Sequence, residues 1–409
     1  MSVGIVGAGI AGLYAARLLE HAGHEVAIFE ATERAGGRIE TYRNGETVYD
    51  AGGEWIDAEH ARVLALCEEF GLPLRASKGA RWGWFGGQRF TTDALPEAIL
   101  EDESRFEEAA CLAQSTPEQT LEDLVRTTTV TDAGRWWITA NYRSDEGDDI
   151  DRIGLTGWLR GYAHYAERAG GELSAFSLER GMQSLTDAIA QGLASPIRFR
   201  TPATTISDSE INGECFDHIV VTSPPQACLK IDWQRPISEQ KRRAWLACGM
   251  ARALKVAWEF DRPWWREIGW TGSLFCDEPV QQTWDGTRGE TAVLLAYICG
   301  TDAQRVHERR RSEGDEAVAR SLLNDLAKVT PIDGNIRSCR IHDWIETTGG
   351  AFSYMPAGFA ENHVVHLNSP EGRIHFAGEH TATWMGFIEG ALESAEQAVR
   401  EIQTDLDPS

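Results

Sequence analysis

The stretch SVGIVGAGIAGLYAARLLEHAGHEVAIFE, residues 2–30, decides the fold. It reads as a short apolar strand, a glycine turn at residues 7–12 (GAGIAG), an alanine- and leucine-rich helix, and a second strand that ends at Glu30. A carboxylate at that point can accept hydrogen bonds from both hydroxyls of an adenosine ribose. The order of strand, glycine turn, helix, strand and acidic residue is the dinucleotide-binding fingerprint. The sequence therefore predicts an α/β fold with a Rossmann-like domain at its start.

The residues of the glycine turn have separate tasks. Gly7 permits the tight turn, Gly9 lets the backbone approach a pyrophosphate, and Gly12 lets the helix pack on the strand. Ile10 and Ala11 open the helix, whose N-terminal N–H groups and positive dipole end attract phosphates. All five residues are therefore candidates for holding the nucleotide.

A second glycine turn indicates which dinucleotide is bound. Gly36-Gly37-Arg38 begins only six residues after Glu30. A nicotinamide enzyme has no need for such a turn near the ribose acid, whereas FAD carries a pyrophosphate and a long ribityl chain that a further backbone contact and a cation can hold. The alternative is a plain surface turn. We expect FAD.

Composition limits the partners and the compartment. The chain has 409 residues, enough for two domains, and a net charge of −24 that argues against nucleic acid and anionic membranes. Met1 leads directly into the strand, no apolar run approaches the ~20 residues of a membrane span, and the eight cysteines form no CxxC pair, so we expect a cytoplasmic protein. We expect no metal site, and His363 and His366 are predicted to lie in an extended segment.

Four further motifs extend the pattern along the chain. They are DAGGEW at residues 50–55, KVAWEFDRPWW at 255–265, FAGEHT at 376–381 and FIEGALES at 387–394. Together with the N-terminal stretch they resemble the flavin-containing amine oxidases, the monoamine oxidase and L-amino-acid oxidase-like group with a glutathione-reductase-type FAD fold. The resemblance covers residues 3–400.

This resemblance implies two discontinuous domains, an α+β arrangement. The FAD-binding domain comprises residues 1–75, 181–235 and 345–409, and a substrate-binding domain of mixed sheet and helices comprises residues 76–180 and 236–344. Within the latter, the acidic run at residues 145–149 (DEGDD) is predicted to be a solvated loop between helices.

The resemblance also implies most of the cofactor site. The backbone at Ala203 would bind adenine, Glu379 would bind a ribitol hydroxyl or the pyrophosphate region, and the N-terminus of the last helix would point at the flavin C2 carbonyl. The full predicted set of cofactor-binding residues is Gly7, Gly9, Ile10, Ala11, Gly12, Glu30, Gly36, Gly37, Arg38, Gly52, Gly53, Glu54, Trp55, Ala203, Trp344, Gly378, Glu379, Phe387 and Ile388.

Four residues are implied to act at the reacting centre. Lys255 would hydrogen-bond through a water to the flavin N5 edge. Phe352 and Phe387 stand where the mitochondrial enzymes have two tyrosines that flank the amine, and Trp384 lies in a loop one residue shorter than theirs. Ala351 replaces a cysteine that bonds covalently to the flavin in those enzymes, so we predict non-covalent FAD.

The implied reaction is oxidation of a primary or secondary amine. Hydride passes from the α-carbon to flavin N5, the imine hydrolyses, and O2 reoxidises the flavin to give hydrogen peroxide. The expected partners are a small-molecule amine or amino acid and O2, and a homodimer is possible.

Three alternatives stay open. An L-amino-acid oxidase would need an arginine for the substrate carboxylate; Trp55 occupies the family position, but Arg62, Arg81, Arg143 or Arg160 could supply one. A flavin desaturase of a carbon skeleton or a non-catalytic flavoprotein are the others.

Overall fold

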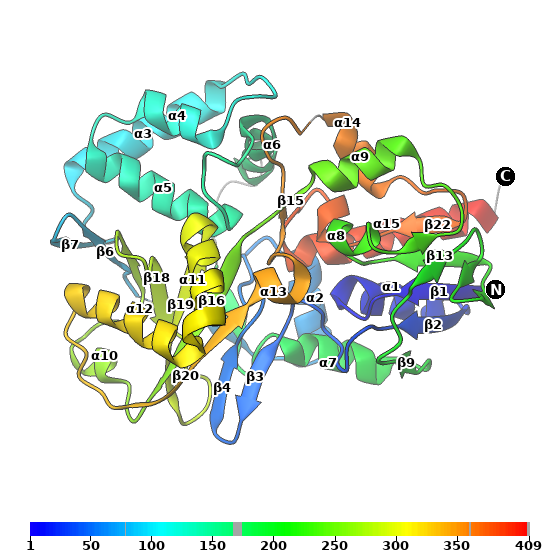
Figure 1. Cartoon of the computed structure of the whole chain (residues 1–409), viewed down its shortest axis with the longest axis horizontal. Helices are drawn as coiled ribbons and strands as arrows, with labels where there is room; N and C mark the ends of the chain where they lie inside the picture. Colours follow the sequence, from blue (N-terminus) through cyan, green and yellow to red (C-terminus); the bar gives the residue numbers. More distant parts are fainter. Residues whose placement is uncertain (78, 167–173, 360, 407–409) are drawn as a thin grey trace.

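The computed structural model describes residues 1–77, 79–166, 174–359 and 361–406. Two main sheets lie toward opposite ends of the molecule, and the first and last helices lie side by side at one of these ends (Figure 1). In the part of the chain that is described, no helix is both long and apolar enough to cross a membrane.

One main sheet is parallel throughout and contains the first and last strands of the chain. Its order is β22-β13-β1-β2-β9, so β1 lies at its centre. The strands are β1 (Ser2–Val6), β2 (Glu25–Phe29), β9 (Ile197–Arg198), β13 (His218–Val221) and β22 (Ile374–Phe376). Because parallel sheets are covered on both faces, these strands are apolar and largely buried rather than alternating.

Helices from distant parts of the chain cover this sheet. Helix α1 (Ile10–His21) packs against α15 (Ile388–Leu406) and α7 (Gln183–Gly192), and α2 (Ala61–Glu69) lies against α15. The shared core includes Leu13 and Leu392, which are both fully buried. The first and last helices of the chain therefore stabilise each other.

The second main sheet has seven strands in the order β20-β16-β19-β18-β17-β6-β7. Its strands are β6 (Trp82–Phe85), β7 (Gln88–Thr91), β16 (Ala253–Phe260), β17 (Leu274–Cys276), β18 (Gln282–Asp285), β19 (Ala292–Cys299) and β20 (Ile336–Asp343). The two sheets thus draw their strands from the two sets of segments predicted to form separate domains, while the domain boundaries themselves stay a prediction.

Strand β16 is buried on both faces. Trp258 faces α12 (Asp315–Val329), where its indole N–H donates to Ala319 O at 2.9 Å. Lys255 and Glu259 point to the opposite face, toward the hairpin of β3 (Thr41–Asn44) and β4 (Thr47–Asp50). The alternation of the sequence therefore separates an apolar face from a face that contains buried charges.

The remaining elements connect and cover these sheets. The helices are α3 (Glu97–Leu112), α4 (Leu121–Thr128), α5 (Asp132–Glu146), α6 (Leu155–Ala166), α8 (Pro225–Cys228), α9 (Glu239–Ala247), α10 (Trp264–Glu267), α11 (Gly300–Glu313), α13 (Trp344–Thr348), α14 (Glu361–Asn368) and the 3-10 turn η1 (Glu379–Thr381). The short strands are β5 (Leu74–Ala76), β8 (Phe176–Leu178), β10 (Thr205–Ile206), β11 (Glu210–Ile211), β12 (Glu214–Cys215), β14 (Asp232–Trp233), β15 (Gly249–Met250) and β21 (Ser353–Tyr354).

Two local predictions were wrong. His363 and His366 lie in helix α14, not in an extended segment. The acidic run at 145–149 is not a solvated loop: α5 ends at Glu146, and Asp148 is fully buried, where it accepts hydrogen bonds from the Arg252 guanidinium. A cation about a hundred residues away decides this burial, and no local pattern could reveal it.

Candidate active site

One cavity of about 2090 Å³ lies where the carboxyl ends of the parallel strands meet the mixed sheet. Val6, Phe29, Thr222 and Gly378, at or just after the ends of β1, β2, β13 and β22, all line it. This edge is where open α/β sheets bind ligands. Small-molecule pockets usually enclose about 300–1,000 Å³, so this cavity has room for a cofactor and a substrate together.

The N-terminus of α1 opens into this cavity. Gly9 is its N-cap and provides no capping side chain, the first turn contains no acidic residue, and Ile10 and Ala11 line the cavity. A Cβ added to Gly9 would have only the Gly37 Cα, at 4.0 Å, near it. The uncapped N–H groups and the small side chains form a cradle suited to a pyrophosphate.

Gly12 contributes in a different way from its neighbours. It is absent from the described residues that line the cavity, and a Cβ on it would lie 2.0 Å from the Gly7 carbonyl oxygen. Its expected contact with the cofactor is therefore not seen, whereas its expected role in close packing of helix on strand matches the geometry.

Glu30 and the second glycine turn fix the nucleotide end. Glu30 Oε2 accepts from Ala8 N at 2.7 Å, and Oε1 accepts from Thr32 N at 2.8 Å, so the carboxylate is held at the cavity wall. Gly36 N donates to Ala8 O at 2.8 Å with a φ of 105°, which only glycine adopts readily. Ala203 also lines this end.

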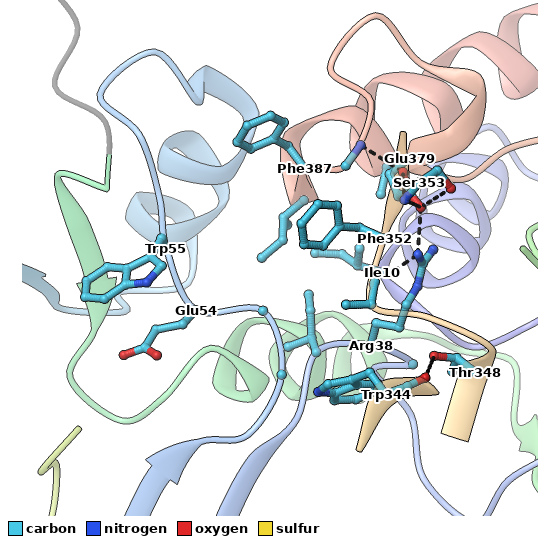
Figure 2. Close-up of a pocket in the computed structure, with 18 of the residues that line it drawn as sticks. Ile10, Arg38, Glu54, Trp55, Trp344, Thr348, Phe352, Ser353, Glu379 and Phe387 are labelled. Carbon is cyan, nitrogen blue, oxygen red and sulfur yellow. Dashed lines mark hydrogen bonds and ion pairs between the residues drawn. The ribbon is translucent and has the colours of Figure 1, made fainter. Parts of the chain in front are cut away.

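Glu379 joins three segments at the middle of the cavity (Figure 2). Its carboxylate accepts from the Arg38 guanidinium at 2.6 Å, from Ser353 Oγ at 2.9 Å and from Gly386 N at 2.8 Å. Burial alone would raise the pKa of Glu379, but Arg38 and these hydrogen bonds hold it below its usual value. Glu379 therefore holds the site together through protein contacts, and the ribitol contact stays a prediction.

Lys255 lines the cavity, and its amino group has three acceptors. Nζ donates to Asp50 O at 3.0 Å, to Gly52 O at 2.9 Å and to Glu54 Oε2 at 2.9 Å. Glu54 also accepts from the Trp284 indole N–H at 3.2 Å. The lysine is thus held against the glycine segment rather than extended into open space.

Arg288 completes a buried group of charges, and sequence reasoning missed it. Its Nη2 lies 2.6 Å from Glu54 Oε1 and 2.8 Å from Asp50 Oδ2, and its side chain is only 1% exposed. We call Asp50, Glu54, Lys255 and Arg288 the charge tetrad. Burial would raise the pKa of Glu54, but Lys255 and then Arg288 lower it, so Glu54 is a carboxylate.

Aromatic side chains form the walls of the substrate end. In Figure 2, Trp55 lies on one side of the cavity, and Phe352 and Phe387 extend from the other. Trp384 also lines the cavity and meets Phe387 edge-on, with ring centroids 5.8 Å apart. Buried His60 contacts both of these rings from behind, at 5.1 Å and 5.3 Å. The four aromatic residues therefore surround one chamber.

The other predicted cofactor residues also lie at this cavity. The Trp344 indole N–H donates to Ala51 O at 3.0 Å, which fixes the segment that leads to Gly52 and Gly53. The Gly378 backbone and Ile388, the first residue of α15, complete the lining. Except for Gly12, every residue assigned to the site from sequence lines this one cavity; their roles toward a cofactor stay predictions.

Three acidic residues line the substrate end and were not predicted. They are Asp57, Asp145 and Glu146. Burial raises the pKa of Asp57 to about 6, although Ser174 N donates to its Oδ1 at 2.7 Å. Asp145 is exposed to the cavity and Glu146 is half-buried; desolvation by the surrounding protein raises the pKa of Asp145 to about 6 and, together with Asp145, that of Glu146 to about 8. The three carboxyl groups therefore favour binding of a cation over binding of an anion in this chamber.

Of the four arginines considered as anchors for a substrate carboxylate, two are among the described residues that line the cavity and two are not. Arg62 is bound to Glu389 and Glu396 on another surface. Arg81 and Arg160 line the cavity, whereas Arg143 is absent from the described lining residues. Arg81 stacks over the Phe275 ring at 4.3 Å, and its charge partly offsets that of Asp145.

A half-buried histidine beside the tetrad makes stability depend on pH. His342 Nε2 lies 2.9 Å from Tyr49 Oη, and burial, followed by the charge of Lys255, lowers the pKa of His342 to about 4 from 6.5. The stabilisation of the folded state by neutral His342 is complete above pH 6.5 and is lost as the pH falls through about 4. In this pH range only the unfolded chain binds the proton readily. The free energy of unfolding falls as the pH is lowered, and we expect His342→Gln to make this fall smaller by up to about 3 kcal/mol.

The check is urea unfolding of both proteins at pH 7 and pH 4.5. The wild type should lose more free energy of unfolding between the two pH values than the variant does. Equal losses would mean that His342 titrates normally in the folded protein.

A dinucleotide with a flavin at one end suits this cavity. The uncapped start of α1 and the Gly9–Gly37 approach can take the pyrophosphate, Glu30 can take a ribose, and Gly52 and Gly53 leave backbone beside the aromatic chamber. A Cβ on Gly52 would lie 2.2 Å from Arg38 O, so this segment can run so close only as glycine.

Several named proteins are similar to this chain in sequence. The chain is 25% identical over 466 residues to the flavin-containing amine oxidase A of Sus scrofa, a match that covers 99% of this chain and 85% of the relative. It is 25% identical over 455 residues to amine oxidase B of Homo sapiens, covering 97% and 85%. It is 26% identical over 454 residues to an L-amino acid dehydrogenase of Synechocystis, covering 97% and 94%.

Solved structures share the fold. A putrescine oxidase double mutant superimposes with a TM-score of 0.87 at 21% identity, covering 98% of this chain and 99% of that one. Cyclohexylamine oxidase from Brevibacterium oxydans gives 0.85 at 22% identity, covering 99% of both chains. The predicted fold class is thereby confirmed. The model of the family described as flavin containing amine oxidoreductase matches residues 10–403. The chain therefore belongs to that family, which implies FAD as its cofactor, and it is a flavin-dependent oxidoreductase.

Proposed function

We propose that this protein is an FAD-dependent oxidase of a primary or secondary amine, with O2 as the electron acceptor. The observation that carries the proposal is the chamber at the end of the cavity, where Trp55, Phe352, Trp384 and Phe387 stand with three carboxyl groups. Aromatic faces receive amines and cations well, and carboxylates attract them. Relatives named amine oxidases agree with this choice.

The side chains of the chamber prepare the amine for oxidation. FAD, when bound, would supply the redox chemistry, namely uptake of a hydride from the α-carbon of the amine and transfer of two electrons to O2. The amine must be neutral at nitrogen to release that hydride, so the ammonium ion that the carboxyl groups attract must first give up a proton. Asp57 and Asp145, whose pKa values are raised to about 6, stay largely ionised at neutral pH and can take up the ammonium proton, whereas Glu146, with a pKa of about 8, is largely protonated there. The resulting imine hydrolyses to a carbonyl compound and ammonia or a smaller amine.

The same carboxyl groups favour an amine over an amino acid. A substrate carboxylate would have to reach Arg81 or Arg160 while lying near Asp145 and Glu146, and Asp145 already opposes the charge of Arg81. The relative named as an L-amino acid dehydrogenase makes amino acids the second candidate class. A desaturase of a carbon skeleton gains nothing from three acids in its chamber.

We further propose that the FAD is held without a covalent bond. Ala351 lines the cavity and has no nucleophile, and its carbonyl accepts from Arg38 at 3.2 Å. No cysteine occurs among the described residues that line the cavity. Acid precipitation of the purified protein should therefore release a yellow supernatant and leave a colourless pellet.

A peroxide assay tests the function directly. Air-saturated protein is mixed with monoamines, diamines and L-amino acids in parallel, and hydrogen peroxide and flavin bleaching under nitrogen are followed. We expect an amine to give a kcat/KM at least about tenfold above that of any amino acid. Preference for an amino acid would replace the proposal by its second candidate, and a colourless protein that binds no FAD would refute both.

A further inference from the structure

The amino group of Lys255 has no hydrogen-bond donor left for the cavity in this structure. An ammonium has three N–H donors, and Asp50 O, Gly52 O and Glu54 Oε2 accept all three, at 3.0, 2.9 and 2.9 Å. The residue is only 7% exposed. A water held by this lysine, as the sequence resemblance predicts, would require one of these bonds to open.

The charge of Lys255 is neutralised as well. Glu54 Oε2 lies 2.9 Å from Nζ, and Glu54 Oε1 lies 2.6 Å from the Arg288 guanidinium, which also reaches Asp50. Lys255 and Arg288 lower the pKa of Glu54, whereas burial raises the pKa of Asp50, so the neutral unit is the direct pair of Lys255 with the Glu54 carboxylate. A balanced group of buried charges exerts a far weaker field on its surroundings than one unpaired cation does.

We propose that Glu54 is a positioning residue, which holds Lys255 as a neutralised cation and thereby slows reoxidation of the bound flavin by O2. The inference rests on the proposed use of O2 as acceptor. In that half-reaction O2 receives two electrons from the reduced flavin together with two protons and leaves as hydrogen peroxide. Electron transfer to O2 builds negative charge on it, so a nearby unpaired cation favours the step and a paired one does not.

The decisive variant is Glu54→Gln, which keeps the shape and can keep the hydrogen bond to Lys255, but removes the negative charge and turns an amide NH2 toward Arg288. The tetrad is then one charge unit more positive, and Lys255 has lost its carboxylate partner. We expect the second-order rate constant for reoxidation by O2 to rise about tenfold. The protein is loaded with FAD, reduced with dithionite and mixed with O2 in a stopped-flow instrument, so no amine substrate is needed.

Glu259→Gln is the matched control. Glu259 lies four residues along β16 from Lys255, is also buried, and accepts from Thr47 Oγ1 at 3.2 Å instead of from the tetrad. We expect its rate constant to stay within about twofold of wild type. If Glu54→Gln is no faster than wild type, or if Glu259→Gln is accelerated equally, the proposal is wrong.

Removing both partners separates the proposal from a direct role of the lysine. Lys255→Met alone leaves Glu54 without its cation and should slow reoxidation. In the Glu54→Gln background the substitution should abolish the whole gain, because the pair is then removed as a neutral unit. A double variant as fast as Glu54→Gln would mean that Lys255 does not cause the gain. A double variant tenfold or more slower than wild type would show that Lys255 acts as a free cation, and this result would overturn the proposal even if Glu54→Gln failed to fold.

The reduction potential of the flavin gives a readout that does not depend on turnover. An unpaired cation stabilises the more negative, reduced flavin, so dye equilibration should give a more positive potential for Glu54→Gln and an unchanged one for Glu259→Gln. An unchanged potential in both variants would contradict the proposal. Because dithionite replaces the amine, a failed amine assay would refute the proposed substrate and leave this result valid.

Discussion

Replacing Arg288 by methionine is expected to lower the free energy of unfolding by about 3–5 kcal/mol. The side chain is 1% exposed and contacts both Asp50 and Glu54, so its loss leaves two buried carboxylates to share Lys255 alone. It also removes a hydrogen bond of 2.8 Å to Leu178 O. Chemical denaturation of the FAD-loaded protein measures the change.

Two comparison proteins show whether charge causes this loss. The double variant Glu54→Gln/Arg288→Met removes one charge of each sign, so it should recover a large part of the stability. Arg309→Met breaks an ion pair with Glu313 on the surface of α11, both partners being at least 40% exposed, and should cost less than about 1 kcal/mol. A double variant as unstable as Arg288→Met would mean that lost packing, not charge, is responsible.

Gly12→Ala is expected to destabilise the protein by about 3 kcal/mol, at the upper end of the cost of overpacking. Its Cβ would lie 2.0 Å from the Gly7 carbonyl oxygen and 3.2 Å from Thr222 Oγ1, so α1 must move away from the sheet. That movement displaces the helix N-terminus from the cavity. We therefore expect a lower melting temperature and a protein that retains little FAD after desalting.

Gly9→Ala separates the cofactor from the fold. Gly9 has a φ of −69°, which alanine adopts, and no atom lies nearer than 4.0 Å to the added Cβ, but this Cβ would enter the cavity. Without FAD its melting temperature should match that of wild type, whereas the stabilisation by added FAD should be smaller. If Gly9→Ala and Gly12→Ala behave alike in the absence of FAD, the two glycines do not have the separate roles described above.

The nucleotide half could be predicted because its signals are local. Glycines at 7, 9 and 12 must lie between a strand and a helix for their backbone roles to make sense, and Glu30 must end the next strand. These constraints act over about thirty neighbouring residues. The pattern therefore identified the parallel sheet, the turn and the cavity edge from sequence.

The charge tetrad could not be predicted, because its members meet only in the folded chain. The position of Lys255 follows from the strand pattern, but Arg288 lies in a connection after β18 with no motif around it, and the ionised state of Glu54 depends on both cations. The acidic run at 145–149 fails for the same reason, since Arg252 buries Asp148 from another segment. The composition gives the number of charged residues, but it does not show which of them pair in the folded chain.

The pairing of β22 with β13 and the packing of α15 on α1 have a consequence for biosynthesis. Residues 2–30 are synthesised first, but the strand and helix that finish their sheet and cover their apolar surface are synthesised last. At about 5–20 residues per second, a ribosome takes roughly 20 to 70 seconds to reach them. During that time the nascent chain exposes apolar surface, and because residues within 378–391 also line the cavity, we expect the complete cofactor site to form only after translation ends.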